Sequence, residues 1–82
     1  MKLFVKNIEP SINEAQLEYL FVQFGEVVET KIIYDRITWE SRGFGFVEMK
    51  NKNDAMKAII NLDGKEVKGK PLKVEEFTDK RK

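Results

Sequence analysis

The chain has 82 residues, which is enough for one small domain with only a few kcal/mol of stability. It contains no cysteine and no histidine. Disulfides, zinc sites built on these residues, thiol nucleophiles and imidazole bases are therefore excluded, and with them most enzyme chemistry, so we expect no metal ion and no cofactor. The net charge is +1, but residues 7–30 hold five acids and no base, whereas residues 31–82 hold thirteen bases and nine acids. This asymmetry either orients a polyanion toward one side of the fold or reflects ordinary solvated surface.

The first predicted element is a strand over residues 3–6. Its alternation points Leu3 and Val5 into the core and Phe4 and Lys6 toward solvent. The apolar run is too short for a signal peptide or a membrane span, and no longer apolar run follows. We therefore expect a soluble, cytoplasmic protein that does not contact a membrane.

A helix is predicted next, beginning at the capping box formed by Ser11 and Glu14 and ending at Gly25. Its expected buried stripe is Ile12, Leu17, Leu20, Phe21 and Phe24. Tyr19 and Val22 fall outside this stripe. They either form a small apolar patch for a partner or are ordinary exposed apolar residues.

A second strand is predicted over residues 27–34, with Lys31 and Ile33 outward. The residues expected to face the core are Val28, Thr30 and Ile32. Residues 35–40, which include the only tryptophan, Trp39, are expected to form a hairpin loop.

The strand over residues 41–49 has two faces of opposite character. Val47 and Met49 suit a core, whereas Phe44 and Phe46 share their face with Glu48 and the charge of Arg42. Both aromatic rings are therefore predicted to face solvent. The adjacent glycines, Gly43 and Gly45, leave no side chain beside the rings, so a flat base could approach the backbone.

The last two predicted elements are a helix capped by Asn51 and ended by Asp63 and Gly64, and a strand over residues 72–75. The helix is expected to bury Ala55, Ala58, Ile59 and Leu62, and the strand to bury Leu72 and Val74. Residues 78–82 form a short basic tail after a domain that spans residues 1–77.

The element order is strand, helix, strand, strand, helix, strand. Right-handed crossovers then predict an α+β fold, a ferredoxin-like βαββαβ sandwich with a four-stranded antiparallel sheet of order 4-1-3-2 and both helices on one face. The open face is expected to carry Phe4, Lys6, Lys31, Ile33, Phe44, Phe46, Glu48, Lys73 and Glu75.

Over essentially its whole length the chain resembles an RNA recognition motif. Residues 42–49 are similar to the RNP octamer of that family, with Met49 in place of its last aromatic residue, and residues 3–8 are similar to the RNP hexamer. The resemblance implies that Phe4 and Phe46 stack bases, that Phe44 lies against the sugars between them, and that Arg42 pairs with a phosphate.

Other contacts implied by the resemblance are less defined. Lys6, Lys31 and Lys73, together with groups near Phe77, are candidates for base edges and phosphates. Phe77 could lie on the sheet as a further platform or fold under the sheet edge as a plug. Trp39 stands where the family commonly has glycine, so its ring could contact nucleic acid or pack on the surface.

Three classes of function follow. The favoured one is a non-catalytic, monomeric module that binds single-stranded RNA, or single-stranded DNA in vitro, for post-transcriptional regulation or RNA chaperoning; a short chain with one motif resembles stand-alone bacterial members of the family. The alternative is a protein-interaction domain that uses the helix residues Tyr19, Val22, Met56 and Ile60. An acylphosphatase-like enzyme would need an arginine in the loop at residues 7–11, which has none.

Overall fold

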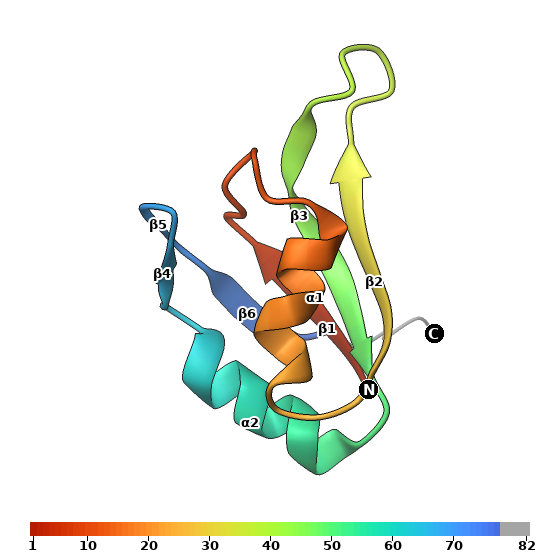
Figure 1. Cartoon of the computed structure of the whole chain (residues 1–82), viewed down its shortest axis with the longest axis vertical. Coiled ribbons are helices and arrows are strands. Elements are labelled where there is room, and N and C mark those ends of the chain that lie inside the picture. The colour runs from red at the N-terminus through yellow and green to blue at the C-terminus, as the bar shows by residue number, and fades with distance from the viewer. Residues whose placement is uncertain (78–82) are drawn as a thin grey trace, which may run out of the picture.

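The computed structural model describes residues 1–77, so the basic tail expected at residues 78–82 lies outside the described residues. The elements are β1 (Lys2–Lys6), α1 (Glu14–Val22), β2 (Val27–Tyr34), β3 (Ser41–Met49), α2 (Lys52–Leu62), β4 (Glu66–Val67), β5 (Lys70–Pro71) and β6 (Lys73–Glu76) (Figure 1). The small β4–β5 hairpin has no counterpart among the predicted elements. No helix within residues 1–77 is long and apolar enough to cross a membrane.

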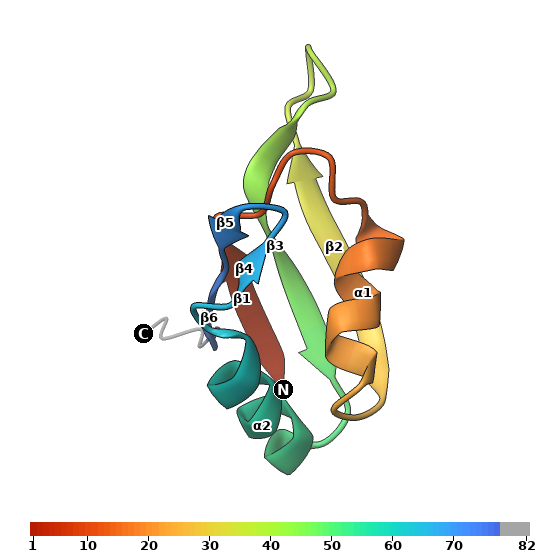
Figure 2. The same cartoon turned by 60° about the vertical axis from the view of Figure 1, so that its left-hand side comes forward.

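The main sheet has the strand order β2-β3-β1-β6, and every pairing in it is antiparallel. With β6 as the fourth long strand, this is the predicted 4-1-3-2 order. The two helices cover the same face of the sheet, as the two views together show (Figure 1, Figure 2). The opposite face is left uncovered by helices, which confirms the predicted layer arrangement.

The core lies between the sheet and the helices. From the two central strands it takes Leu3, Val5, Val47 and Met49, each with no exposed surface. The helices contribute Leu17, Phe21, Ala55, Ala58 and Leu62. Because alternate residues of a strand face opposite ways, burial of this set turns the intervening side chains of β1 and β3 away from the core.

The start of α1 differs from the prediction. Asn13, not Ser11, is the N-cap: its side chain accepts a hydrogen bond from the Gln16 backbone N–H at 2.8 Å, and the Gln16 side chain accepts one from the Asn13 N–H at 3.0 Å. The Ser11 N–H and hydroxyl instead donate to the Glu9 carboxylate. A capping box is therefore present, but it begins two residues later than expected.

The end of α1 also differs. The helix ends at Val22, with Gln23 as its C-cap, so Gly25 does not terminate it. A Cβ atom at Gly25 would collide with the side chain of Asp54 in the first turn of α2. Glycine at this position therefore allows the two segments to approach closely. In the buried stripe, Leu17 and Phe21 are fully buried, whereas Leu20 and Phe24 are only partly buried.

The register of β2 places Val28 outward, contrary to the prediction. Val27 pairs with Met49 and Glu29 pairs with Glu48, so one extra residue is accommodated between these pairs. Val27 packs against the core and Val28 is 57% exposed. After the bulge the predicted alternation holds as far as Ile32, which is buried, with Lys31 exposed; a second register shift follows between Ile32 and Tyr34.

In α2 the predicted boundaries hold. Asn51 is the N-cap residue, although its side chain donates to the Asp54 carboxylate at 3.3 Å and does not cap a helix N–H. The Asp63 N–H donates to the Ile59 carbonyl at the other end, and the Asp63 carboxylate accepts from the Val74 N–H at 3.0 Å. This last contact ties the end of α2 to the edge strand β6.

Candidate nucleic-acid interface

An aromatic cluster occupies the centre of the uncovered sheet face. Phe4 of β1 and Phe46 of β3 are directly paired, and their rings are stacked with centroids 5.2 Å apart and planes 23° apart. The Phe44 ring meets the Phe4 ring edge to face at 5.8 Å. All three side chains are only partly buried. The face thus presents adjacent aromatic surfaces on which flat, apolar groups can stack.

Phe77 joins this cluster from the segment after β6. Its ring lies 6.4 Å from that of Phe4 and 5.2 Å from that of Phe46, edge to face in both cases. The Phe77 N–H donates to the Lys2 carbonyl at 2.9 Å, which extends the pairing of β1 beyond the last residue of β6. Of the two alternatives, the structure therefore places Phe77 on the sheet face and not under its edge.

Lysine side chains flank the rings. The Lys6 ammonium is 5.4 Å from the Phe4 centroid, and the Lys2 ammonium is 5.5 Å from the Phe46 centroid and 5.7 Å from that of Phe77. These separations are typical of cation–π contacts. Lys2 was missed as a site residue, although it has the same strand parity as Phe4 and Lys6 and that parity would have identified it.

Two more predicted lysines lie on the same face. Lys31 pairs with Phe46 across β2 and β3, and Lys73 pairs with Lys6 across β6 and β1. Both are exposed. Acidic side chains are interspersed among them: Glu29 and Glu48 line a small hollow with Lys2, Lys31 and Phe46. The face is therefore of mixed charge and not uniformly basic.

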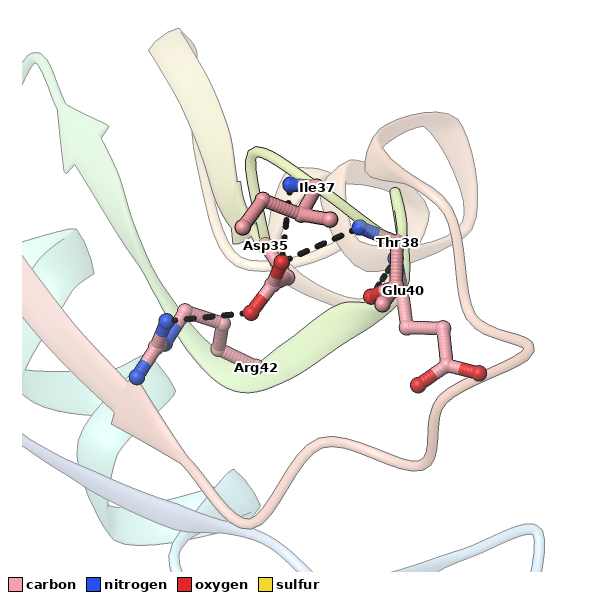
Figure 3. A network of polar contacts seen from close by, with 5 residues as sticks. All are labelled: Asp35, Ile37, Thr38, Glu40 and Arg42. Atoms are coloured by element: carbon pink, nitrogen blue, oxygen red, sulfur yellow. Dashed lines mark hydrogen bonds and ion pairs between the residues drawn. The ribbon is translucent and has the colours of Figure 1, made fainter.

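Arg42 lies at the edge of the face, where a network holds the β2–β3 loop (Figure 3). The Asp35 carboxylate accepts N–H bonds from Thr38 at 3.1 Å and Ile37 at 2.8 Å, and its other oxygen lies 3.5 Å from an Arg42 nitrogen. The two backbone hydrogen bonds, from Thr38 first, lower the pKa of Asp35 below its usual value. Asp35 is therefore ionised at neutral pH. Its contact with Arg42 is nevertheless weak, because it is long and exposed.

Trp39 is separate from the aromatic cluster. It has a left-handed backbone, with φ of 64°, and its side chain is 78% exposed. Its neighbours in a surface hollow are Pro10, Tyr34, Glu40 and Ser41, whereas Arg42 and Phe44 line a different hollow. Glycine adopts this left-handed conformation at the least cost, which explains why glycine would suit position 39. The structure does not bring Trp39 next to the other predicted site residues.

The two glycines of β3 have another role than the sequence suggested. A Cβ atom at Gly45 would collide with the Lys31 carbonyl oxygen and lie 3.0 Å from the Ile32 Cα, so Gly45 allows the close approach of β2. Gly43 has φ of 84°, which favours glycine, and its carbonyl accepts from the Ile8 N–H at 2.9 Å.

The rings of this site can stack flat groups, and its lysines can pair with nearby anions. None of the predicted site residues carries a group suited to bond-breaking chemistry. Within residues 1–77 no three potential metal-ligating side chains gather into a cluster. The predicted site residues Phe4, Lys6, Lys31, Phe44, Phe46, Lys73 and Phe77 share one face, with Arg42 at its edge and Trp39 beyond it.

Comparison with known proteins gives a consistent result. The family model for the RNA recognition motif matches residues 3–73. The chain is 42% identical over 79 residues to the 31 kDa chloroplastic ribonucleoprotein of Nicotiana sylvestris, covering 96% of this chain and 25% of that protein. It is 40% identical over 79 residues to mitochondrial glycine-rich RNA-binding protein 2 of Arabidopsis thaliana, covering 96% of this chain and 50% of that protein.

A solved structure agrees in fold and length. The crystal structure of RNA-binding protein PG1 superposes with a TM-score of 0.92 at 40% identity, covering 100% of this chain and 99% of that one. The chain spans only a quarter to a half of the length of the two plant relatives.

Proposed function

The chain belongs to the RNA recognition motif family, and from this premise we propose that it binds single-stranded RNA by stacking bases on Phe4 and Phe46. The observation that carries the proposal is the stacked, partly exposed pair of rings at the centre of the uncovered sheet face. Each base stacked on an aromatic ring contributes about 1–3 kcal/mol. A single strand is the expected ligand because duplex RNA does not offer its base faces to a sheet.

Phosphate contacts would add to this stacking. Arg42 is available because its pairing with Asp35 is long, at 3.5 Å, and exposed, and such pairs contribute little stability. Lys31 and Lys73 are exposed on the same face. In this arrangement Phe44 lies against the sugars, and Phe77 offers a further ring beside the two platforms. Single-stranded DNA, which has the same phosphates and differs in its bases only by thymine in place of uracil, would bind in vitro.

The test is equilibrium binding of a fluorescent single-stranded RNA, compared with the same strand annealed to its complement. We expect the single strand to bind more tightly by about tenfold or more, since stacking on two rings is available only to unpaired bases. Ile60→Ser, at an exposed position of α2 on the helix side, is a control variant that should bind both forms of the RNA as the wild type does. Equal affinity for strand and duplex would contradict stacking as the mode of binding.

For the biological role, we propose post-transcriptional regulation or RNA chaperoning by a monomeric, non-catalytic protein. The names of the relatives, a ribonucleoprotein and a glycine-rich RNA-binding protein, support an RNA-directed role. Both relatives come from plants, so a particular likeness to bacterial stand-alone proteins gains no support from them. We likewise propose a cytoplasmic location, which cell fractionation would test. Analytical sedimentation would test whether the protein is a monomer.

A second candidate function is protein binding on the helix side. An apolar groove of about 370 Å³ lies between α1 and the β4–β5 hairpin, lined by Ile12, Ala15, Tyr19, Leu20 and Val67 among others. Tyr19 is 67% exposed. Panning a displayed peptide library against the protein would test this function: peptides that bind the groove should lose binding to Tyr19→Ser but not to Ile60→Ser on α2. If no enriched peptide depends on Tyr19, the groove is not a peptide site.

A further inference from the structure

Besides its aromatic neighbours, the Phe4 ring lies next to an ion pair formed by Lys6 and Glu75. The Lys6 ammonium lies 5.4 Å from the ring centroid and 3.1 Å from a carboxylate oxygen of Glu75. Glu75 is the residue of β6 directly opposite Phe4, and Lys6 is two residues along β1 on the same face. A base that stacks on Phe4 would take the place of the Lys6 ammonium over the ring. The displaced ammonium and the Glu75 carboxylate would then meet the base side by side at its edge.

Both charged groups are accessible to a ligand. The Lys6 and Glu75 side chains are 43% and 46% exposed. An ion pair this exposed contributes little stability, so the two groups can separate to contact a base without a large cost. The third charged group in this region, Lys73, lies opposite Lys6 and is also exposed, so it can take a phosphate while the ion pair reads the base.

We infer that this pair makes the Phe4 platform selective for guanine. The inference rests on the proposed function and specifies its ligand. Guanine carries the O6 acceptor next to two donors, N1–H and N2–H. A carboxylate, which only accepts, can take both N–H groups with its two oxygens, while an ammonium, which only donates, binds O6. The pair of Lys6 and Glu75 supplies this complement.

The other bases fit this pair less well. Uracil has a single N3–H between two carbonyl acceptors, so a carboxylate that approaches N3–H also faces an oxygen lone pair. Adenine and cytosine each offer one amino group to Glu75 and one ring nitrogen to Lys6, and neither can donate to both carboxylate oxygens from two separate nitrogens. A base that leaves one of these charged groups without its complementary partner forms fewer hydrogen bonds and therefore binds less tightly. The expected order is guanine first and uracil last.

The experiment measures binding of four labelled heptamers, each with three uridines on either side of one variable central base, and of a fifth that carries inosine there. Inosine keeps O6 and N1–H and lacks the N2 amino group. We expect the wild-type protein to prefer guanine to uracil by about tenfold and guanine to inosine by about threefold. Glu75→Gln should remove most of both preferences, because an amide offers only one acceptor.

Matched variants distinguish an effect on base selectivity from a general effect of charge on RNA affinity. Glu76→Gln removes the same charge from the next residue of β6, and it should leave the guanine preference unchanged. Lys73→Met should weaken all five oligonucleotides by a similar factor. Unchanged thermal unfolding of Glu75→Gln, expected because its ion pair with Lys6 is largely solvated, would show that its effect is on recognition.

The outcomes are distinct. Loss of the guanine-to-inosine difference in Glu75→Gln alone would support the inference. Equal binding of all bases by the wild type, or a guanine preference that survives in Glu75→Gln, would overturn it while RNA binding itself stands. Failure of every oligonucleotide to bind would overturn the proposed function and the inference together.

Discussion

Phe4 and Phe46 face each other across β1 and β3, with ring centroids 5.2 Å apart. The two rings come from segments more than forty residues apart in the sequence, and only the antiparallel register brings them together. Leu3 and Val47 form the neighbouring pair on the other side of the sheet and are fully buried. The packing of the core thereby fixes the relative position of the two proposed base platforms.

Removing two rings should weaken RNA binding without unfolding the protein. For Phe44→Ala combined with Phe46→Ala we expect a loss of about 2–4 kcal/mol in single-stranded RNA affinity, because one base platform and the ring against the sugars disappear and their effects are not fully additive. Isothermal titration would measure the loss, with Tyr19→Ala on α1 as the control for an exposed aromatic residue elsewhere. A double variant that is unfolded at room temperature would contradict the exposed position of both rings.

Salt should weaken binding to a moderate degree. If Arg42 and the lysines of the face make about three to five phosphate contacts, log K against log salt concentration should have a slope of about −2 to −3.5 for a single strand. The acids Glu29, Glu48 and Glu75 on the same face argue against a steeper dependence. Anisotropy titrations at four salt concentrations would give the slope. A slope near zero with binding intact would show that phosphates are not contacted.

The N-cap of α1 gives a stability test. Asn13→Ala should lower the free energy of unfolding by about 1 kcal/mol, because the Gln16 N–H loses its acceptor. Ser11→Ala should have a smaller effect, since the Ser11 hydroxyl makes only exposed side-chain contacts, with the Glu9 carboxylate and, at 3.2 Å, the Lys68 ammonium, and caps no helix N–H. Urea unfolding would measure both. A larger loss for Ser11→Ala than for Asn13→Ala would contradict the cap position.

Trp39 reports on the β2–β3 loop because it is the only tryptophan. With its side chain 78% exposed, its emission in the free protein should be red-shifted, close to that of indole in water. Quenching or a blue shift on adding RNA, with a loss of about 1 kcal/mol in Trp39→Ala, would indicate a nucleic-acid contact. An unchanged spectrum at saturating RNA would assign the ring to surface packing. A blue-shifted emission without RNA would contradict the exposed position.

The sheet and its exposed face were predictable because strand parity has a period of two. Leu3, Val5, Val47 and Met49 suit the inner face so well that the phenylalanines of the same strands had to face outward. Parity fails where the ladder has an extra residue, and the bulge after Val27 accordingly exposes Val28. A bulge has no signal in the sequence of β2 that would have revealed it.

Local polar chemistry was less predictable. Ser11 and Asn13 are both good N-cap residues, and only the position of the buried Ile12 and the contact of Ser11 with Glu9 decide between them. The role of Gly45 depends on the backbone of β2, which sequence spacing alone does not place. The ion pair of Lys6 and Glu75 joins two strands that are distant in the sequence but adjacent in the sheet. Predicting it would have required the register of β1 with β6. Interactions between strands therefore required the structure.

The most direct test of the central claim is a two-dimensional NMR titration with single-stranded RNA. The account predicts that the aromatic resonances of Phe4, Phe44 and Phe46 and the amides of β1 and β3 shift on binding, while the amides on the outer side of α1 and α2 stay in place. Shifts confined to the helices, with the sheet face unchanged, would contradict it.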